Sequence, residues 1–282
     1  MFILLKNIVL SAFALSNKEF IKNHNSENHS YTVEENRFIN NIYINEFNPI
    51  DHNIYQSNNN SILINFTDLN KDSIDWRDNY KVSSVKNQGH CGSCWAFSSV
   101  GAVESAWAIK HNTLYNLSEQ ELIDCSSQNH GCEGGSMDLA FQYIINNSLC
   151  SNLSYPYTAK DGQQCQNDCK SLVKISNYSD IIQNEEKMLM FAVQHQPVSV
   201  AIQANKRSFQ MYQSGIYSDP DCGFELDHGV LLIGYGYDKD YDMDYWIIKN
   251  SWSSQWGENG YIRIQRNIDD TRGLCGIAMN PS

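Results

Sequence analysis

Nine cysteines constrain this chain more than any other feature, because they all fall between Cys91 and Cys275 and their number is odd. Cysteines at this density serve as disulfides, as metal ligands, or as a mixture of these with one reactive thiol. Disulfides can pair at most eight of the nine. At least one thiol is therefore left over for other chemistry.

The 282-residue chain changes its composition near residue 72. Residues 1–16 (MFILLKNIVLSAFALS) form a short apolar stretch that ends in small residues, which predicts a secretory signal peptide. Residues 17–72 are polar and rich in Asn, and we interpret them as a short, degenerate propeptide. Trp, Gly and Cys become frequent after that point, so the functional domain is expected to span residues 73–282. A membrane span needs about 20 apolar residues, so no stable span is expected.

Charge excludes one class of partner. The formal net charge is −12, and such a surface repels phosphate backbones, so nucleic acid is not an expected partner. Passage through the secretory pathway would make disulfides the default state of the cysteines. Sequons for N-glycosylation fit that route and are typical of a glycoprotein, although an Asn-rich chain also produces them by chance: Asn28, Asn59, Asn65, Asn116, Asn146, Asn152 and Asn177.

Apolar periodicity divides the domain into two halves. Helical patterns cover residues 94–109, 136–145 and 185–194, and Ser118 with Glu121 forms a capping-box pattern that begins one more helix. Strand patterns follow at residues 198–203, 229–235, 245–249 and 261–265. This order predicts an α+β protein with a mainly helical lobe over residues 73–177, a mainly β lobe over residues 178–282, and a site in the cleft between them.

The run QGHCGSCW, which contains Gln88 and Cys94, carries the chemistry. A thiol is a strong nucleophile only as a thiolate, and a helix N-terminus beside an imidazolium lowers its pKa. Cys94 lies where the first helix should begin, and His228 would form the ion pair and later protonate the leaving amine. Asn250 would orient the imidazole, with Trp252 shielding that bond from water. Gln88 and the backbone N–H of Cys94 would stabilise the oxyanion.

Two structural alternatives compete with this interpretation. Cys91 and Cys94 form a C-x-x-C pair, which is also typical of a redox dithiol or of half a zinc site. No second ligand pair follows at metal spacing and no βαβ pattern precedes the motif, so neither a metal nor a cofactor is expected. A lone His is usually structural, but His228 is accompanied by Asn250 and Trp252, which favours the catalytic role.

The domain resembles the papain-like cysteine peptidases from residue 74 to residue 277. The motifs that carry the likeness are the Cys94 run and LSEQELIDC (117–125), GCEGG (131–135), YPY (155–157), QPVSV (196–200), NSW (250–252) and WGENGY (256–261). The resemblance implies a helical lobe, a β-barrel-like lobe, an active-site cleft between them, and endopeptidase action through an acyl-enzyme thioester. It also implies four disulfides that leave Cys94 free: Cys91–Cys132, Cys125–Cys165, Cys222–Cys275 and Cys150–Cys169.

The resemblance also implies residues that bind substrate. Gly134 and Gly135 would offer backbone hydrogen bonds to an extended peptide. A mainly apolar pocket would prefer a hydrophobic side chain at the second residue before the scissile bond. The residues assigned to this pocket and its surroundings are Met137, Ala201, Leu226, Asp227, Gly229, Trp252 and Asn280. Met137 and Ala201 could equally be core residues, and the glycine pair could serve only a turn.

Finer features of the resemblance concern the subfamily and the partners. The run SMD (136–138) is similar to cathepsin L rather than cathepsin B, and the spacing of Cys150, Cys165 and Cys169 is similar to the cathepsin L-like enzymes of apicomplexan parasites. Residues 34–45 are only loosely similar to the inhibitory helix of such propeptides. The implied partners are protein or peptide substrates, the chain's own propeptide as an inhibitor, and cystatin-like inhibitors.

The sequence leaves three hypotheses for the function. Endopeptidase action in a lysosome-like or vacuole-like acidic compartment, or outside the cell, follows from the resemblance. A secreted binding protein on an inactive peptidase fold is the first alternative, but such relatives lose the nucleophile or the base, and this chain retains both. Acyl transfer by the same Cys–His pair is the second alternative, and only a product assay distinguishes it from hydrolysis.

Overall fold

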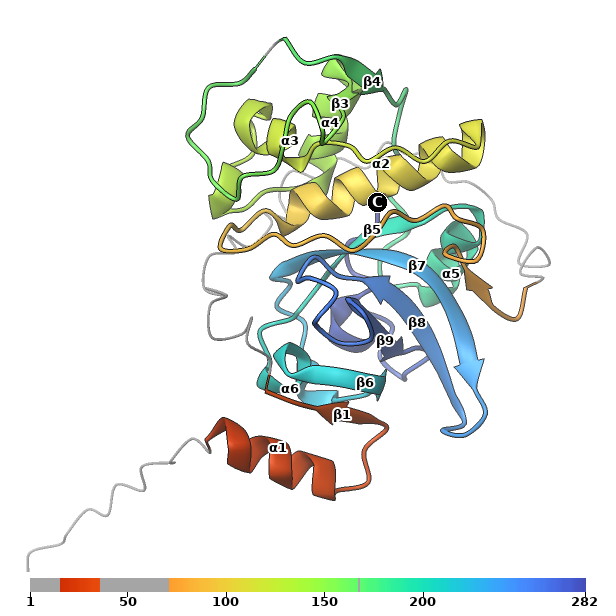
Figure 1. Cartoon of the computed structure of the whole chain (residues 1–282). Coiled ribbons are helices and arrows are strands. Elements are labelled where there is room, and N and C mark those ends of the chain that lie inside the picture. Colours follow the sequence, from red (N-terminus) through yellow and green to blue (C-terminus); the bar gives the residue numbers. More distant parts are fainter. Residues whose placement is uncertain (1–15, 36–70, 167) are drawn as a thin grey trace, which may run out of the picture.

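Two clusters of buried apolar side chains organise the computed structural model, which describes residues 16–35, 71–166 and 168–282. One cluster fills a β lobe, and the other packs the helices of a helical lobe against sheet residues that include Ala201, Leu231 and Ile247. Figure 1 shows the two lobes. The predicted α+β class with two lobes is therefore confirmed. Residues 1–15 of the expected signal peptide and residues 36–70 of the expected propeptide lie outside the described residues.

The helical lobe is built on α2 (Cys94–His111), which is buried along most of its length. Its apolar side chains surround the whole helix, as expected for a helix packed on all sides. In Figure 1 it lies between the other helices of its own lobe and the sheet. The other elements of this lobe are α3 (Glu119–Cys125), the 3₁₀ turn η5 (Gly131–Glu133), α4 (Met137–Asn147) and the strand pair β3 (Leu149–Cys150) and β4 (Ser171–Val173).

The start of α3 corrects one detail of the sequence analysis. The Ser118 hydroxyl accepts a hydrogen bond from the Glu121 N–H at 3.0 Å, which is the predicted cap. The reciprocal half of the capping box does not form, because the Ser118 N–H donates to the Cys150 carbonyl at 3.0 Å. Glu121 instead accepts from the Cys150 N–H at 2.7 Å, so this buried carboxylate ties α3 to β3.

The β lobe is a sheet in the order β1-β6-β9-β8-β7-β2, with β5 also paired to β7. Its bounds are β2 (Ile74–Asp75), β5 (Val198–Ile202), β6 (Tyr212–Tyr217), β7 (His228–Asp238), β8 (Met243–Lys249) and β9 (Tyr261–Gln265). The helices of this lobe are α5 (Glu186–His195), α6 (Arg207–Gln210), η6 (Pro220–Cys222) and η7 (Leu274–Gly276). Because β7 pairs antiparallel with β8, with Leu231 opposite Lys249, the start of β7 lies beside the end of β8.

The described N-terminal segment packs on this sheet rather than on α2. It contains α1 (Asn17–Ser26) and β1 (Tyr31–Val33), and β1 pairs antiparallel with β6. The Arg207 guanidinium lies 4.6 Å from the ring centre of Phe20, which adds a cation–π contact. Figure 1 shows α1 and β1 at the end of the β lobe away from the helical lobe.

Four disulfides form, and each lies within a single lobe: Cys91–Cys132, Cys125–Cys165, Cys150–Cys169 and Cys222–Cys275. These are the pairs that the resemblance implies. The first three lie in the helical lobe and the fourth joins η6 to η7. In the part of the chain that is described, no helix is long and apolar enough to cross a membrane.

Candidate active site

Cys94 is the first residue of α2 and the one free cysteine of the nine, all of which are described. The residue before the helix, Ser93, makes no side-chain cap. The first N–H groups of a helix lack partners within the helix. Hydrogen bonds from the backbone N–H groups of Trp95 and Gly229 favour the thiolate form of Cys94. The sulfur therefore lies at the anion-stabilising end of a helix.

His228 begins β7 and is held by Asn250, which follows the last residue of β8. His228 Nε2 lies 2.8 Å from Asn250 Oδ1, and both residues are buried. An amide oxygen only accepts, so Nε2 carries the proton and Nδ1 is left as the base. Gly229 brings β7 against α2: a Cβ at this position would lie only 3.3 Å from the Cys94 carbonyl oxygen. The register of β7 thus sets the imidazole beside the start of α2.

Trp252 covers this pair. Its ring stacks on the His228 ring at 4.7 Å between centroids and 28° between planes. Trp252 is itself buried against Phe209 and Trp256 of the β-lobe core. The indole therefore shields the imidazole–amide hydrogen bond from water, which strengthens it.

Burial opposes the lowered thiol pKa that the sequence analysis expects. It raises the pKa of Cys94 to about 12, against the Gly229 and Trp95 hydrogen bonds that lower it. It also lowers the pKa of His228 to about 4, while the hydrogen bond to Asn250 raises it. Neither group charges alone in this site, since each lone charge would lose its water. Proton transfer from Cys94 to His228 would charge both at once, and their mutual attraction would oppose the cost of desolvation.

Both polar atoms of the Gln88 side-chain amide form hydrogen bonds. Gln88 Nε2 donates to the Cys91 carbonyl at 2.9 Å, and Oε1 accepts from the Ser251 hydroxyl at 2.6 Å. An amide nitrogen has two protons. The second Gln88 proton can therefore stabilise an oxyanion formed near Cys94.

Ser251 is a functional residue that the sequence analysis missed. Its hydroxyl holds Gln88, and its backbone N–H donates to Asn250 Oδ1 at 2.8 Å. Tyr157 acts similarly, since its hydroxyl donates to the Gln88 carbonyl at 2.7 Å. Both residues lie inside the NSW and YPY motifs, so their positions were visible in the sequence but their contacts were not.

Three of the residues expected to bind substrate meet beside Cys94. Ala201 pairs with Gly229 between β5 and β7, and a Cβ on Gly229 would lie 3.4 Å from the Met137 sulfur. Leu226 belongs to the same apolar cluster as Met137 and Ala201. Asn280 is buried next to Pro281, which bridges to Val200 of β5. The expected pocket residues are therefore contributed by both lobes.

The remaining candidates have clear backbone roles. Gly134 has φ 112°, a conformation that L side chains rarely adopt. A Cβ on Gly135 would lie 2.7 Å from the Trp95 ring, so only glycine fits there. Asp227 accepts from the Ala204 N–H at 2.6 Å, and burial raises its pKa to about 6.

One group of described side chains has the spacing of a metal site: Glu121, Cys150 and Cys169. Its two sulfur atoms are joined in a disulfide. A disulfide offers no thiolate, so the donor set does not suit a metal ion.

Comparisons with known proteins agree with a thiol–imidazole site on this two-lobe fold. The family model "Papain family cysteine protease" matches residues 70–282. "Probable cysteine protease RD21C" of Arabidopsis thaliana is 51% identical over 215 residues, covering 75% of this chain and 47% of the relative. "Oryzain beta chain" of Oryza sativa is also 51% identical over 215 residues, covering 75% and 46%. The chain thus spans about half the length of these curated relatives.

Solved structures give the same result. The bromelain protease from Ananas comosus in complex with the E64 inhibitor has a TM-score of 0.72 at 45% identity, covering 75% of this chain and 97% of that chain. The proform of the ragweed pollen allergen Amb a 11, a cysteine protease, has a TM-score of 0.85 at 37% identity, covering 94% and 83%. This chain belongs to the papain family of cysteine proteases.

Proposed function

We propose that the protein is a cysteine endopeptidase. The observation that carries the proposal is the 2.8 Å bond between His228 Nε2 and Asn250 Oδ1, which leaves Nδ1 as the basic nitrogen of the imidazole. Gly229, the next residue, packs against Cys94, the free thiol at the start of α2. The Cys94 thiolate attacks the peptide carbonyl carbon and forms a C–S bond. His228 gives its proton to the leaving nitrogen as the C–N bond breaks, which leaves a thioester on Cys94. His228 then takes a proton from water, the hydroxide attacks the thioester carbon, and the C–S bond breaks, so that the acid product leaves and the Cys94 thiolate is regenerated.

The oxyanion formed in both steps is stabilised by Gln88. Its amide is held by Cys91 and Ser251 before substrate arrives, so no reorganisation is needed during the reaction. Preorganised donors of this kind are worth about 3 kcal/mol each. The backbone N–H of Cys94 is the second proposed donor.

Substrate preference follows from the apolar cluster beside Cys94. Met137, Ala201 and Leu226 are nearly fully buried, and they would contact the second side chain before the scissile bond. An aliphatic or aromatic side chain would bury apolar area there, which is favourable by about 25 cal/mol per Å². Gly134 and Gly135 would bind the substrate backbone as an added strand.

We propose that residues 17–72 are a propeptide and that residues 73–282 are the mature enzyme. The docking of β1 on β6 supports this division, and so does the likeness to a proform that covers 94% of this chain. The propeptide would act as an inhibitor until it is removed. After its removal, cystatin-like proteins could inhibit the enzyme at the same site.

The route and the subfamily are also proposals. Residues 1–16 would direct the chain to the secretory pathway, and an acidic vacuole-like or lysosome-like compartment, or the extracellular space, would be its destination. The relatives named above are plant proteins. The closer likeness to apicomplexan cathepsin L-like enzymes therefore stays a prediction, supported by the Cys150–Cys169 bridge.

A product assay tests the proposed function. The chain is matured in acid and incubated with an unlabelled protein at about pH 5.5, a value between the usual pKa values of the carboxylates and of histidine, and products are identified by mass spectrometry. Internal cleavage with addition of water is expected, and Cys94→Ala should abolish it. Products in which an amine has replaced the leaving group would identify acyl transfer instead. No product from a folded chain would refute both.

A further inference from the structure

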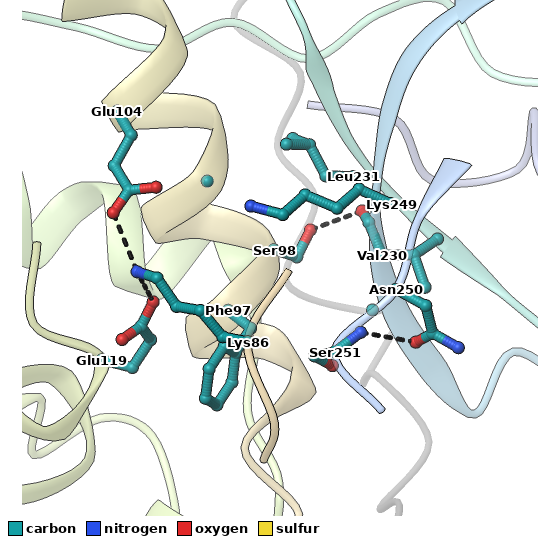
Figure 2. A pocket seen from close by; sticks show the side chains of 12 residues that line it. Lys86, Phe97, Ser98, Glu104, Glu119, Val230, Leu231, Lys249, Asn250 and Ser251 are labelled. Carbon is teal, nitrogen blue, oxygen red and sulfur yellow. Dashed lines mark hydrogen bonds and ion pairs between the residues drawn. The ribbon is translucent and has the colours of Figure 1, made fainter. Parts of the chain in front are cut away.

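A small cavity lies between α2 and the sheet, next to Asn250, and both polar and apolar side chains line it. Its volume is about 20 Å³, which is room for about one water molecule. Side chains from both lobes line it, and Figure 2 shows them converging: Lys86, Ser98, Glu104, Glu119, Lys249 and Asn250. Two cations and two anions in one buried site balance formally to zero.

Three of these charges form an ion-paired group within the helical lobe. Lys86 Nζ lies 2.9 Å from Glu104 and 2.5 Å from Glu119. Glu104 projects from α2, and Glu119 is the first residue of α3. Both carboxylates are almost completely buried. This group alone keeps a formal charge of −1, and Glu119 Oε2 is buried without a hydrogen-bond partner among the described residues.

Lys249 is the charge that the β lobe adds. It ends β8, and its ammonium points toward α2 in Figure 2. Lys249 Nζ donates to the Ser83 hydroxyl at 2.8 Å, and Ser83 in turn donates to Glu104. The next residue along the chain is Asn250, which holds His228. One side chain thus connects the helix that carries the nucleophile with the strand end that carries the imidazole's partner.

We propose that Lys249 is a positioning residue, which anchors the end of β8 to α2 through Ser83 and Glu104 and so holds the Asn250–His228 arm against Cys94. The inference rests on the proposed function, because it assigns a role in the same reaction. Small displacements matter in such a site: an error of about 1 Å in a reacting group can cost about 100-fold in rate. The Ser98 hydroxyl donates to the Val230 carbonyl at 2.7 Å, which joins α2 to β7 rather than to β8.

The environment of Lys249 makes this anchor depend on pH. Burial lowers its pKa to about 8, against the attraction of Glu104; Lys86 lowers it further and Glu119 raises it. The charge-assisted bond is present below that pH and is lost as the pH rises through it. Arg keeps its charge throughout this range, because its pKa exceeds about 12. Lys249→Arg should therefore remove the decrease in kcat that the ionisation of Lys249 causes at alkaline pH.

The test uses the full chain after maturation, with rates expressed per titrated active site. The wild-type kcat should fall by up to about 100-fold as the pH rises through about 8, because Lys249 loses its charge there. Lys249→Arg should lack this fall and keep an unchanged KM. Lys249→Met should hold kcat about 100-fold below the neutral-pH wild-type value at all pH values. The exposed Lys239→Arg is the matched control and should follow the wild type.

A wild-type kcat that does not fall as the pH rises through about 8 would overturn the proposal, even where a variant fails to fold. Identical profiles for wild type and Lys249→Arg would also overturn it. The pH dependence of Cys94 alkylation by an epoxysuccinyl reagent is recorded in parallel. This rate reports the thiol–imidazole geometry without peptide hydrolysis, so a failure of the endopeptidase proposal is distinguishable from a failure of the Lys249 proposal.

Discussion

Replacing Asn250 with Ala removes the hydrogen bond that holds the catalytic imidazole. The bond is 2.8 Å long, and His228 and Asn250 are 4% and 3% exposed. A hydrogen bond to a charged group contributes about 1.5–3 kcal/mol. At about 1.4 kcal/mol per tenfold change, kcat/KM should fall by about 10- to 150-fold.

The loss should appear in kcat rather than in KM, because the bond is strongest when His228 is charged. Asn250 raises the pKa of His228, so its removal lowers that pKa further and disfavours the imidazolium. Stability should change little, since Asn250 Nδ2 is buried without a partner among the described residues and its removal relieves that cost.

The assay is steady-state hydrolysis of a peptide per titrated active site, with thermal unfolding as the test of folding. Asn79→Ala, at an exposed position, is the control. A folded Asn250→Ala enzyme whose kcat/KM lies within twofold of the wild type would refute the role assigned to this bond.

Three further predictions concern Gln88, His24 and the Cys150–Cys169 disulfide. Gln88→Ala should lower kcat by about 100- to 1000-fold with little change in unfolding temperature, measured at saturating substrate, because one oxyanion donor is lost. Acidification below the usual histidine pKa of 6.5 should weaken the docking of β1 on β6, because burial and His29 lower the pKa of His24 and the docked state disfavours the charged ring. The protection factors of the β6 amides in the Cys94→Ala chain, which correct hydrogen exchange for the intrinsic rate at each pH, should fall between neutral and acidic pH. A rise in these protection factors would contradict the prediction. Replacing Cys150 and Cys169 together by Ser should cost about 3 kcal/mol of unfolding free energy in denaturant titrations and leave kcat unchanged, because the bridge closes a short loop distant from Cys94.

Much of the fold is readable from local patterns. The apolar run over residues 94–109 predicts α2, and the observed helix extends slightly further, to His111, before Asn112 adopts a left-handed conformation that ends it. Strands β5, β7, β8 and β9 follow from short β-branched and aromatic runs. Strand β6 escaped the sequence analysis because its partners, β1 and β9, lie far away in the chain and its burial does not alternate.

The residues of the candidate site can be predicted from the sequence, but their pKa values cannot. Cys94, His228, Asn250 and Gln88 stand out by their residue types and motifs. The raised pKa of the Cys94 thiol could not be read from its place at a helix N-terminus, because burial by the opposite lobe exceeds the effect of the backbone N–H groups. Lys249 reads in the sequence as an ordinary charge at the end of a strand, and only the packing of β8 against α2 brings it to Ser83.

The central claim is that Cys94 becomes a nucleophile by transferring its proton to His228, and covalent labelling tests it most directly. The mature protein is treated with an epoxysuccinyl inhibitor at about pH 5.5, where an unpaired thiol is protonated, and the modified residue is identified by mass spectrometry. The account predicts stoichiometric labelling of Cys94 in the wild type and in the exposed control His195→Ala, and none in Cys94→Ala. In folded His228→Ala the labelling rate should fall by about 100-fold or more. Labelling of Cys94 at the wild-type rate without His228 would contradict the claim.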